Sequence, residues 1–471
     1  MLSNTEKYKD LALRPLSRAV IVAAMGIIFG FDIASVFLNQ GFLSSLYLLV
    51  ESQSDIIIGS YILGLLFGTF VAGYITYGSG RKLSIIVSST VGSLAILASF
   101  VAPNLSTLLC AEWVIGFCFG LYLTSASLYI NEIMLPRNRA LSLMLVPFFV
   151  VFGSIIAAIS YQGIPGKPLI SFVILFLINI LLITLAVFKL PESPRYLAVA
   201  GSSDAALSVL FNLRQEMSFA ARELAEINEC CRGETRGIEF FLQNTNYRRL
   251  LAFLCFTAFM FNLSGVTIIP YVLINKLSPT LLCTDNSQCF YTFESYVIYT
   301  AIIAAFISVL LFLFSSERLR RRSLVLTGGV ISAIFLLIGS LATLLDDSAL
   351  KNWIMSISFT GYIIFSFGAY AIFIFVISVE LMPIRAREFG YAAVLVSNST
   401  GILFCIQTYE PALHRFGFTG LLFMCIASTL LALYLIYCFL PNSGKQKLEM
   451  LENRIMSAPS FSRIVSYHDE R

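Results

Sequence analysis

Twelve apolar segments of membrane-spanning length follow one another along the chain, separated mostly by short polar stretches. Each has about 20 residues or more, the length that an α-helix needs to cross a hydrocarbon core of about 30 Å. One longer charged stretch, 191–249, divides the segments into six and six. The segments run over about 16–38, 55–77, 83–102, 106–130, 140–160, 168–190, 250–275, 294–315, 323–345, 352–379, 388–410 and 419–440.

The composition limits what such a chain can be. Hydrophobic residues make up 58% of it and charged residues only 12%, which is about half the charged fraction of an average soluble protein. Too few charges remain to cover a surface that faces water, so the soluble-enzyme, disordered and fibrous classes are excluded. The two histidines are too few for a histidine-rich metal site. The sequence therefore predicts an all-α membrane protein with no metal.

The positive charges are spread unevenly between the two sides of the predicted spans. With both termini inside, 27 of the 31 Lys and Arg residues lie on or near the inner side. This is the positive-inside bias, and the reversed topology would invert it. The first segment has no signal-peptide cleavage site, so it is expected to be a spanning helix. We expect cytoplasmic termini and, because no organelle address is recognisable, the plasma membrane.

The two sets of six segments repeat the same polar signatures. Glu132 and Arg139 follow the fourth segment, and Glu380 and Arg387 follow the tenth, 248 residues later. Two further pairs recur at nearly this offset: Gly80-Arg81-Lys82 with Glu317–Arg322 (240), and Pro191-Glu192-Ser193 with Pro441-Asn442-Ser443 (250). Such recurrence indicates a duplication. Two parallel six-helix repeats around a central path are typical of secondary transporters.

The duplication sets the expected domain boundaries. Within the inner stretch, Ala and Leu alternate with charges at helical spacing over 203–229, which predicts short amphipathic helices. The expected parts are a cytoplasmic N-terminus at 1–15, a six-helix bundle at 16–190, a cytoplasmic helical linker at 191–249, a second six-helix bundle at 250–440 and a cytoplasmic tail at 441–471.

The motifs also carry a family resemblance. In chain order they are the glycines Gly59, Gly64, Gly68 and Gly73 running into GSGRK, then YINEIMLPRNR, PESPRYL, ERLRRR and VELMPIRAR. With them, the chain resembles the sugar-porter branch of the major facilitator superfamily over nearly its whole length. The resemblance implies the major facilitator fold, with twelve transmembrane helices in two six-helix bundles. The last family motif, proline-glutamate-threonine-lysine-glycine, is reduced here to Pro441-Asn442-Ser443-Gly444.

Acidic and basic residues at the inner ends of the segments predict a gate. Bidentate Arg–carboxylate pairs there would clamp the two bundles while the path is closed to the cytoplasm, and would break when it opens. The alternative is solvated charges that contribute little individually, but the fixed spacing in both halves favours the gate. The family usually has Asp or Asn where Tyr77 stands, so the first loop lacks its own acid. The expected gate residues are Gly80, Arg81, Lys82, Glu132, Arg139, Glu192, Arg195, Glu317, Arg321, Arg322, Glu380 and Arg387.

Two ionisable residues, Asp32 and Glu112, stand clear of the ends of the predicted spans. Each lies six residues from the outer end of its span, about 9 Å below the outer boundary at 1.5 Å per residue. In the family that the chain resembles, the first position is Asp in proton-coupled symporters and Asn in facilitators, and the second is Arg in both. Glu112 therefore replaces a base by an acid.

Two carboxylates in a low-dielectric cavity cannot both be charged without a large penalty, so the pair would hold a proton near neutral pH. One hypothesis is a shared-proton coupling site. A second is that Asp32 and Glu112 bind a cationic or amine-bearing substrate directly. The third is that one of the two points to a neighbouring helix and is hydrogen-bonded there.

The solute-binding positions of the family are largely replaced in this chain. The glutamine position of the fifth span is Pro147, and the asparagine position of the eighth is Ala305. The remaining candidates are Asn262, Ser264, Thr267 and Asn398, with Phe375 as an aromatic platform. These polar side chains could equally be interhelical hydrogen bonders, each worth about 1 kcal/mol. We expect a solute smaller, less hydroxylated or more apolar than a hexose.

The sequence thus predicts a secondary active or facilitative transporter of a small polar organic solute, with a sugar or polyol favoured by the resemblance and protons as the coupling ion. The alternatives are an organic cation or amine carrier on the same fold, and a non-transporting nutrient receptor, for which the tail at 441–471 is short. The chain has neither a nucleotide-binding glycine loop nor a Ser/His/Asp set, so we expect no enzyme activity, cofactor or nucleic-acid partner. Cys283 and Cys289 share an outer loop, where a disulfide can form. We expect a functional monomer.

Overall fold

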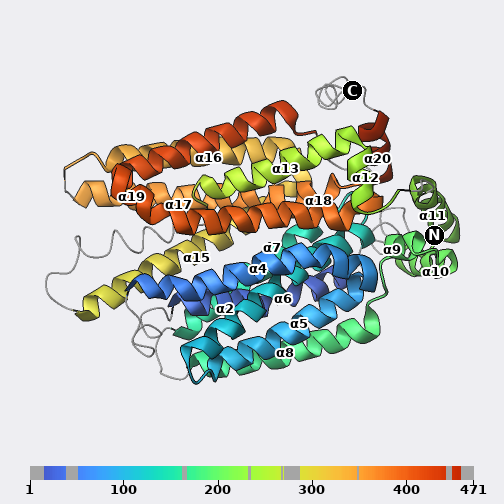
Figure 1. The fold of residues 1–471 in the computed structure, drawn as a ribbon, viewed down its shortest axis with the longest axis horizontal. Coiled ribbons are helices and arrows are strands. Elements are labelled where there is room, and N and C mark those ends of the chain that lie inside the picture. The colour runs from blue at the N-terminus through green and yellow to red at the C-terminus, as the bar shows by residue number, and fades with distance from the viewer. Residues whose placement is uncertain are drawn as a thin grey trace, which may run out of the picture.

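The computed structural model describes residues 15–38, 51–161, 167–231, 235–266, 269, 287–346, 349–441 and 448–457. Within these ranges the chain is helical, and no strand occurs there. The long helices lie side by side along the longest axis of the molecule (Figure 1). Ten helices of the described residues are long and apolar enough to cross a membrane.

The helices of the first half occupy the lower part of Figure 1. Two of them, α4 and α6, cross at glycines, because a Cβ on Gly64 would lie 2.0 Å from the Trp113 carbonyl oxygen and one on Gly116 would lie 2.0 Å from that of Tyr61. Only glycine permits so close an approach of two helix backbones. The helices are α2 (Ile27–Leu38, the end of the span Pro15–Leu38), α4 (Glu51–Ser79), α5 (Arg81–Phe100), α6 (Leu105–Ile133), α7 (Arg139–Tyr161) and α8 (Lys167–Lys189).

The second half contains the helices after residue 245, and most of them lie in the upper part of Figure 1. They are α13 (Thr245–Leu263), α15 (Ser287–Arg318), α16 (Arg321–Ala342), α17 (Ala349–Ala371), the π-helix η1 (Ile372–Ile377), α18 (Ser378–Glu380), the 3-10 helix η2 (Ile384–Ala386) and α19 (Arg387–Phe439). Helix α17, η1 and α18 follow one another as the tenth predicted span.

The difference between ten helices and twelve predicted spans has two causes. The seventh predicted span begins as α13 and continues into residues outside the described ranges. The eleventh and twelfth are joined in α19, which turns at Gly417, where φ is +69° and ψ is 175°. Glycine reaches this φ without steric strain. With α13 included and α19 divided at Gly417, the predicted twelve-helix fold is confirmed for the described part of the chain.

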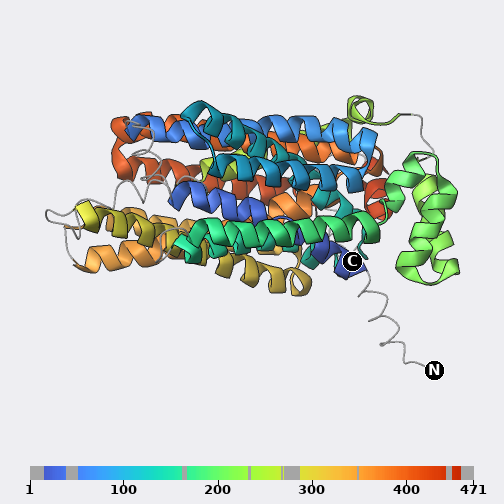
Figure 2. The same cartoon turned by 90° about the horizontal axis from the view of Figure 1, so that it is seen from below.

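Short helices gather at one end of the long ones, on the right in Figures 1 and 2. They are α9 (Pro194–Val199), α10 (Ser203–Arg214), α11 (Met217–Cys231), α12 (Ile238–Gln243) and α20 (Leu448–Ser457). Helices α10 and α11 occupy the stretch for which amphipathic helices are predicted. Ala198, Leu210, Ala220 and Ile227 form one buried cluster with Ile384 of the second half, so α9, α10 and α11 are anchored to that half.

Candidate transport site and gate

Asp32 and Glu112 lie together in the interior of the first half. Asp32 comes from α2 and Glu112 from the second turn of α6, and each is only 2% exposed. Asp32 Oδ2 and Glu112 Oε2 have no hydrogen-bond partner among the described residues. The two carboxyl groups are near enough to interact electrostatically, and no arginine, lysine or histidine of the described part forms an ion pair with either. The site can therefore take up positive charge.

At the end of the long helices where the short helices gather, each half pairs one arginine with one glutamate on neighbouring helices. Arg81, at the start of α5, donates two hydrogen bonds of 3.0 Å to Glu132, near the end of α6. In the second half, Arg321 at the start of α16 pairs with Glu380 at the end of α18. These positions repeat at offsets of 240 and 248, so the duplication in the sequence is also a duplication of contacts.

Two ion pairs cross symmetrically from one half to the other at this end. Arg139 Nη1 lies 3.8 Å from Glu380 Oε1, and Arg387 Nη1 lies 3.8 Å from Glu132 Oε1. The two pairs are related by the offset of 248, and all four side chains are nearly fully buried. We call the end of the molecule that carries Arg81, Glu132, Arg139, Glu380, Arg387 and Glu388 the charged end.

Glu388 of α19 contributes a third crossing ion pair, which the sequence analysis missed. Its carboxylate pairs with Arg81 of the first half. The equivalent position of the first half is Ala140, so this pair is not repeated. The first loop, which lacks an acid at Tyr77, thus receives one from the other half. Tyr77 itself packs on Phe389, with ring centroids 5.5 Å apart.

Glu192 caps a helix and does not form the bidentate arginine pair expected of it. Its carboxylate accepts hydrogen bonds from the backbone N–H groups of Arg81 and Lys82, at 3.0 and 3.2 Å. The first N–H groups of a helix lack intrahelical acceptors, and a negative charge there is stabilising. Gly80 makes the approach possible, since its φ is +87° and a Cβ would lie 2.5 Å from Glu192 Oε2. The Lys82 ammonium donates to the carbonyl of Val187 at 2.8 Å.

Arg195 pairs with α20 and α11. It donates to Glu449 Oε1 at 3.1 and 2.8 Å and lies 3.7 Å from Glu223. Burial alone would raise the pKa of Glu449, but Arg195 outweighs it and lowers this pKa from 4.5 to about 2. A lowered pKa means that the contact stabilises the fold fully above pH 4.5 and loses that contribution as the pH falls through about 2.

Two further predicted gate residues, Glu317 and Arg322, also lie outside the ion-pair network. Glu317 forms no ion pair with any residue that the structure describes. Arg322 donates to the carbonyl of Tyr437 at 2.6 Å and lies over its ring. Glu317 lies in the last turn of α15, and Arg322 lies in the first turn of α16. The basic run 317–322 therefore brings a single residue, Arg321, to a buried carboxylate.

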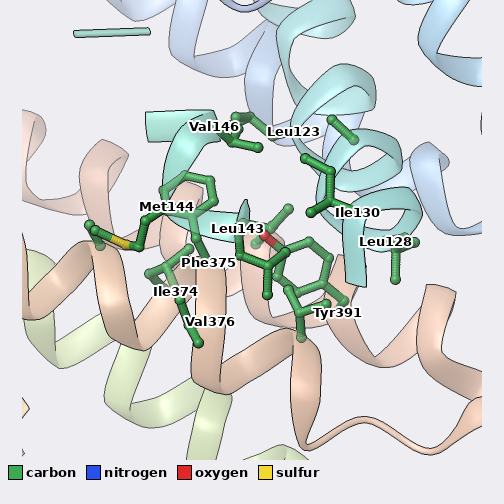
Figure 3. Packing of buried hydrophobic residues seen from close by; sticks show 14 of the residues in the cluster. Leu123, Leu128, Ile130, Leu143, Met144, Val146, Ile374, Phe375, Val376 and Tyr391 are labelled. Carbon is green, nitrogen blue, oxygen red and sulfur yellow. The ribbon is translucent and has the colours of Figure 1, made fainter. Parts of the chain in front are cut away.

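Apolar side chains from both halves fill the space between them next to the charged end. Figure 3 shows Met144 of α7 beside Ile374 and Phe375 of η1, with Leu143 and Tyr391 close to them. These five side chains are at most 8% exposed. Phe375, predicted as a platform for a solute ring, therefore lies in an apolar seal between the halves. The path is closed at the charged end.

Asn262 and Asn398 meet in the second half. Asn262 Nδ2 donates to Asn398 Oδ1 at 2.8 Å, and the Tyr370 hydroxyl donates to the same oxygen at 3.0 Å. Asn398 Nδ2 forms no hydrogen bond with the described residues, so the two bonds at Oδ1 orient an amide that can donate to a solute. Tyr370 was missed by the sequence analysis, because no motif marks it.

The remaining predicted residues are placed only in part. Ser264 is 2% exposed and its hydroxyl donates to the carbonyl of Phe261 in its own helix, at 2.6 Å. Thr267 lies outside the described residues, as does the predicted pairing of Cys283 with Cys289. No group of three or more His, Cys, Asp or Glu side chains that could hold a metal ion occurs among the residues that the structure describes.

Comparison with known proteins places this architecture. The family model "Sugar (and other) transporter" matches residues 18–454. The arabinose-proton symporter of Escherichia coli K12 is 25% identical over 455 residues, with 95% of this chain and 94% of the relative covered. The galactose-proton symporter of the same strain is 23% identical over 458 residues, with 95% and 96% covered.

Among solved structures, the fold is similar to that of the proton:xylose symporter XylE from E. coli, bound to 6-bromo-6-deoxy-D-glucose. The TM-score is 0.77 at 16% identity, and the match covers 93% of this chain and 98% of XylE. The family model covers residues 18–454, a range that contains both sets of helices and the motifs that they repeat. The chain belongs to the sugar transporter family, the sugar porters of the major facilitator superfamily.

Proposed function

We propose that this protein is a secondary transporter that moves a sugar, a polyol or a similarly small polar solute between its two halves by alternating access, coupled to protons. The family match over residues 18–454 supports transport. The arabinose- and galactose-proton symporters among its relatives support the class of solute and the coupling ion. Members of this family transport solutes and are not enzymes.

The observation that carries the proposal is the symmetric pair of crossing contacts at the charged end. Arg139–Glu380 and Arg387–Glu132 join the halves across 3.8 Å, and separation of the halves at this end would break both together. Such contacts suit a rocking motion about a central site. Because basic residues gather at this end, the positive-inside rule supports a cytoplasmic charged end, with both termini on that side of the plasma membrane.

The burial of the acid pair favours a proton over an amine solute. Asp32 and Glu112 come from α2 and α6 of the first half and are each only 2% exposed, so neither carboxyl group adjoins a space open enough for an organic solute. A proton needs no such space, whereas an ammonium group with an organic body does. The pair therefore supports proton coupling, and direct binding of an organic cation becomes the weaker alternative.

The solute site that we propose lies in the second half, at the Asn398 amide. Its Nδ2 is the donor left free by Asn262 and Tyr370. One oriented amide and a phenol offer fewer partners than a hexose has hydroxyl groups. A pentose or a solute with fewer hydroxyl groups therefore fits this set better than a hexose.

Uptake into proteoliposomes tests the proposal. The probes are labelled D-galactose, L-arabinose, D-xylose, myo-inositol and a small amine, each measured with and without an inward proton gradient, with protein-free liposomes as the control. We expect pentose or polyol uptake that the gradient stimulates and a protonophore abolishes. Uptake of the amine alone would contradict the proposed solute, and uptake that ignores the gradient would contradict the coupling. No uptake of any probe would favour a non-transporting receptor.

A further inference from the structure

Among the buried oxygen atoms of the first half that have no hydrogen-bond partner in the described part is the hydroxyl of Tyr61 on α4. Tyr61 is 9% exposed, and its hydroxyl has no hydrogen-bond partner among the described residues. Both Asp32 and Glu112 act on this hydroxyl electrostatically. Buried hydroxyl groups nearly always have a partner, so an unpartnered one beside two carboxyl groups needs an explanation.

Contacts between α4 and α6 hold Tyr61 at the level of Glu112. The Ser60 hydroxyl donates to the carbonyl of Leu109 at 2.8 Å. Two turns further along α6, Gly116 leaves room for the carbonyl of Tyr61. Glu112 lies between these two contact points on α6. The two helices cannot slide at this level without a clash at Gly116, so Tyr61 is fixed near the acid.

Aromatic contacts hold α2 close to Tyr61 on α4 and to the part of α6 that carries Glu112. The ring of Phe119 on α6 lies 5.3 Å from that of Phe29 on α2 and 6.3 Å from that of Tyr61 on α4. Asp32 follows Phe29 by three residues, and Glu112 precedes Phe119 by seven. Residues at these spacings share a helix face, so both acids project from the faces that carry the rings.

The other polar groups that face this interior are engaged or uncharged. The Tyr122 hydroxyl of α6 donates to the carbonyls of Val22 and Ala23, each at 3.0 Å. Helix α6 also contributes the buried Cys118, and α5 contributes buried serines. The charged residues of α5 lie at the charged end, as does Glu388 of α19. Within the described part, the titratable groups that act on Tyr61 are the two acids.

We propose that Tyr61 is a positioning residue of the proton-coupling pair, whose hydroxyl donates, directly or through one water molecule, to the carboxylate that has lost its proton. The inference rests on the coupling role proposed for Asp32 and Glu112. Among the described residues, no arginine, lysine or histidine forms an ion pair with either acid, and Tyr61 offers the pair a donor that has no other partner there. A hydrogen bond to the charged form favours that form, so Tyr61 eases release of the proton and sets the pH at which the pair exchanges it.

Infrared titration of the reconstituted protein tests this without any solute. The carboxyl C=O band of the pair is assigned by its change in Asp32→Asn and Glu112→Gln, and its intensity is followed against pH. In Tyr61→Phe, we expect the midpoint to move up by about one pH unit, the size expected for loss of one hydrogen bond to a charged group. The wild-type difference spectrum across the same titration should also contain a tyrosine hydroxyl band.

Tyr122→Phe is the matched control, because it removes a hydroxyl from the same core whose bonds go to backbone carbonyls. We expect its midpoint to equal that of the wild type. An unchanged midpoint in folded Tyr61→Phe, or an equal shift in Tyr122→Phe, would overturn the proposal. If Tyr61→Phe does not fold, the absence of a tyrosine band from the wild-type spectrum overturns it instead. Loss of gradient-stimulated uptake for every probe would contradict the proposed function, yet would leave this titration unaffected.

Discussion

The interiors of the two halves carry different chemistry although their helices repeat. In the first half, Asp32 and Glu112 are buried acids, each with an unpartnered oxygen. In the second, Asn262, Asn398 and Tyr370 form a neutral cluster joined by bonds of 2.8 and 3.0 Å. Buried acids respond to protons, whereas amides do not titrate and a phenol does so only at high pH. Under the proposed function, the duplicated scaffold assigns coupling to the first half and recognition to the second.

The largest effect on uptake should come from removing the acid Asp32 from the first half. Asp32→Asn leaves a neutral amide in place of the group that exchanges the proton, so gradient-stimulated uptake should fall to the level without a gradient, while solute exchange at equal pH persists. Counterflow and gradient-driven uptake in proteoliposomes measure the two separately. The control is Asp204→Asn, at an exposed position of α10. If uptake by Asp32→Asn keeps the pH dependence of the wild type, the assignment of proton coupling to the first half is wrong.

A smaller effect should follow from the second half. Asn398→Ala removes the oriented donor, and the loss of about one hydrogen bond, roughly 1 kcal/mol, should raise the KM about fivefold without changing the pH dependence. The matched control is Ser399→Ala, because the Ser399 hydroxyl donates to the carbonyl of Leu395 in its own helix. A changed pH profile in Asn398→Ala would show that recognition and coupling are not separated between the halves.

The smallest effect concerns the one crossing pair that the duplication does not repeat. In Glu388→Gln, Arg81 keeps its two bonds to Glu132, so the closed charged end should lose only about 1 kcal/mol and open up to fivefold more often. The opening is measured as the rate at which a thiol reagent labels Ser127→Cys, at the position that hydrogen-bonds to Tyr391. The rate is corrected for labelling of the ten native cysteines. Glu132→Gln should give a larger increase, since it leaves Arg81 and Arg387 with weaker partners. Equal rates in the two variants would contradict the assigned asymmetry.

Features that depend on local composition could be predicted from the sequence. Apolar runs of about 20 residues gave the spanning helices, because each must cross the same hydrocarbon thickness. The repeated Glu132/Arg139 and Glu380/Arg387 motifs predicted charged contacts between the halves, and these residues form the two crossing ion pairs. The resemblance to the sugar porters rested on the same motifs, and the family model confirms it.

Features that depend on which side chains are in contact could not be predicted from the sequence. Glu388, Tyr370 and Tyr61 belong to no repeated motif, and only tertiary packing brings them to Arg81, Asn398 and the acid pair. Glu192 has the residue type expected of a gate acid, but its carboxylate accepts hydrogen bonds from the N–H groups at the start of α5 and does not pair with an arginine side chain. The choice between such partners is a matter of distances of a few ångströms, which a linear pattern does not encode.

Glu132 and Glu380 each contact two arginines, and this arrangement has a kinetic consequence. Each carboxylate is paired with an arginine of its own half and lies 3.8 Å from an arginine of the other. When the halves part, Glu132 and Glu380 lose only these longer contacts, and each remains neutralised by the arginine of its own half. The activation free energy of opening therefore excludes the penalty of leaving either of these two buried carboxylates without a base. A transporter built in this way can change state rapidly and still close tightly.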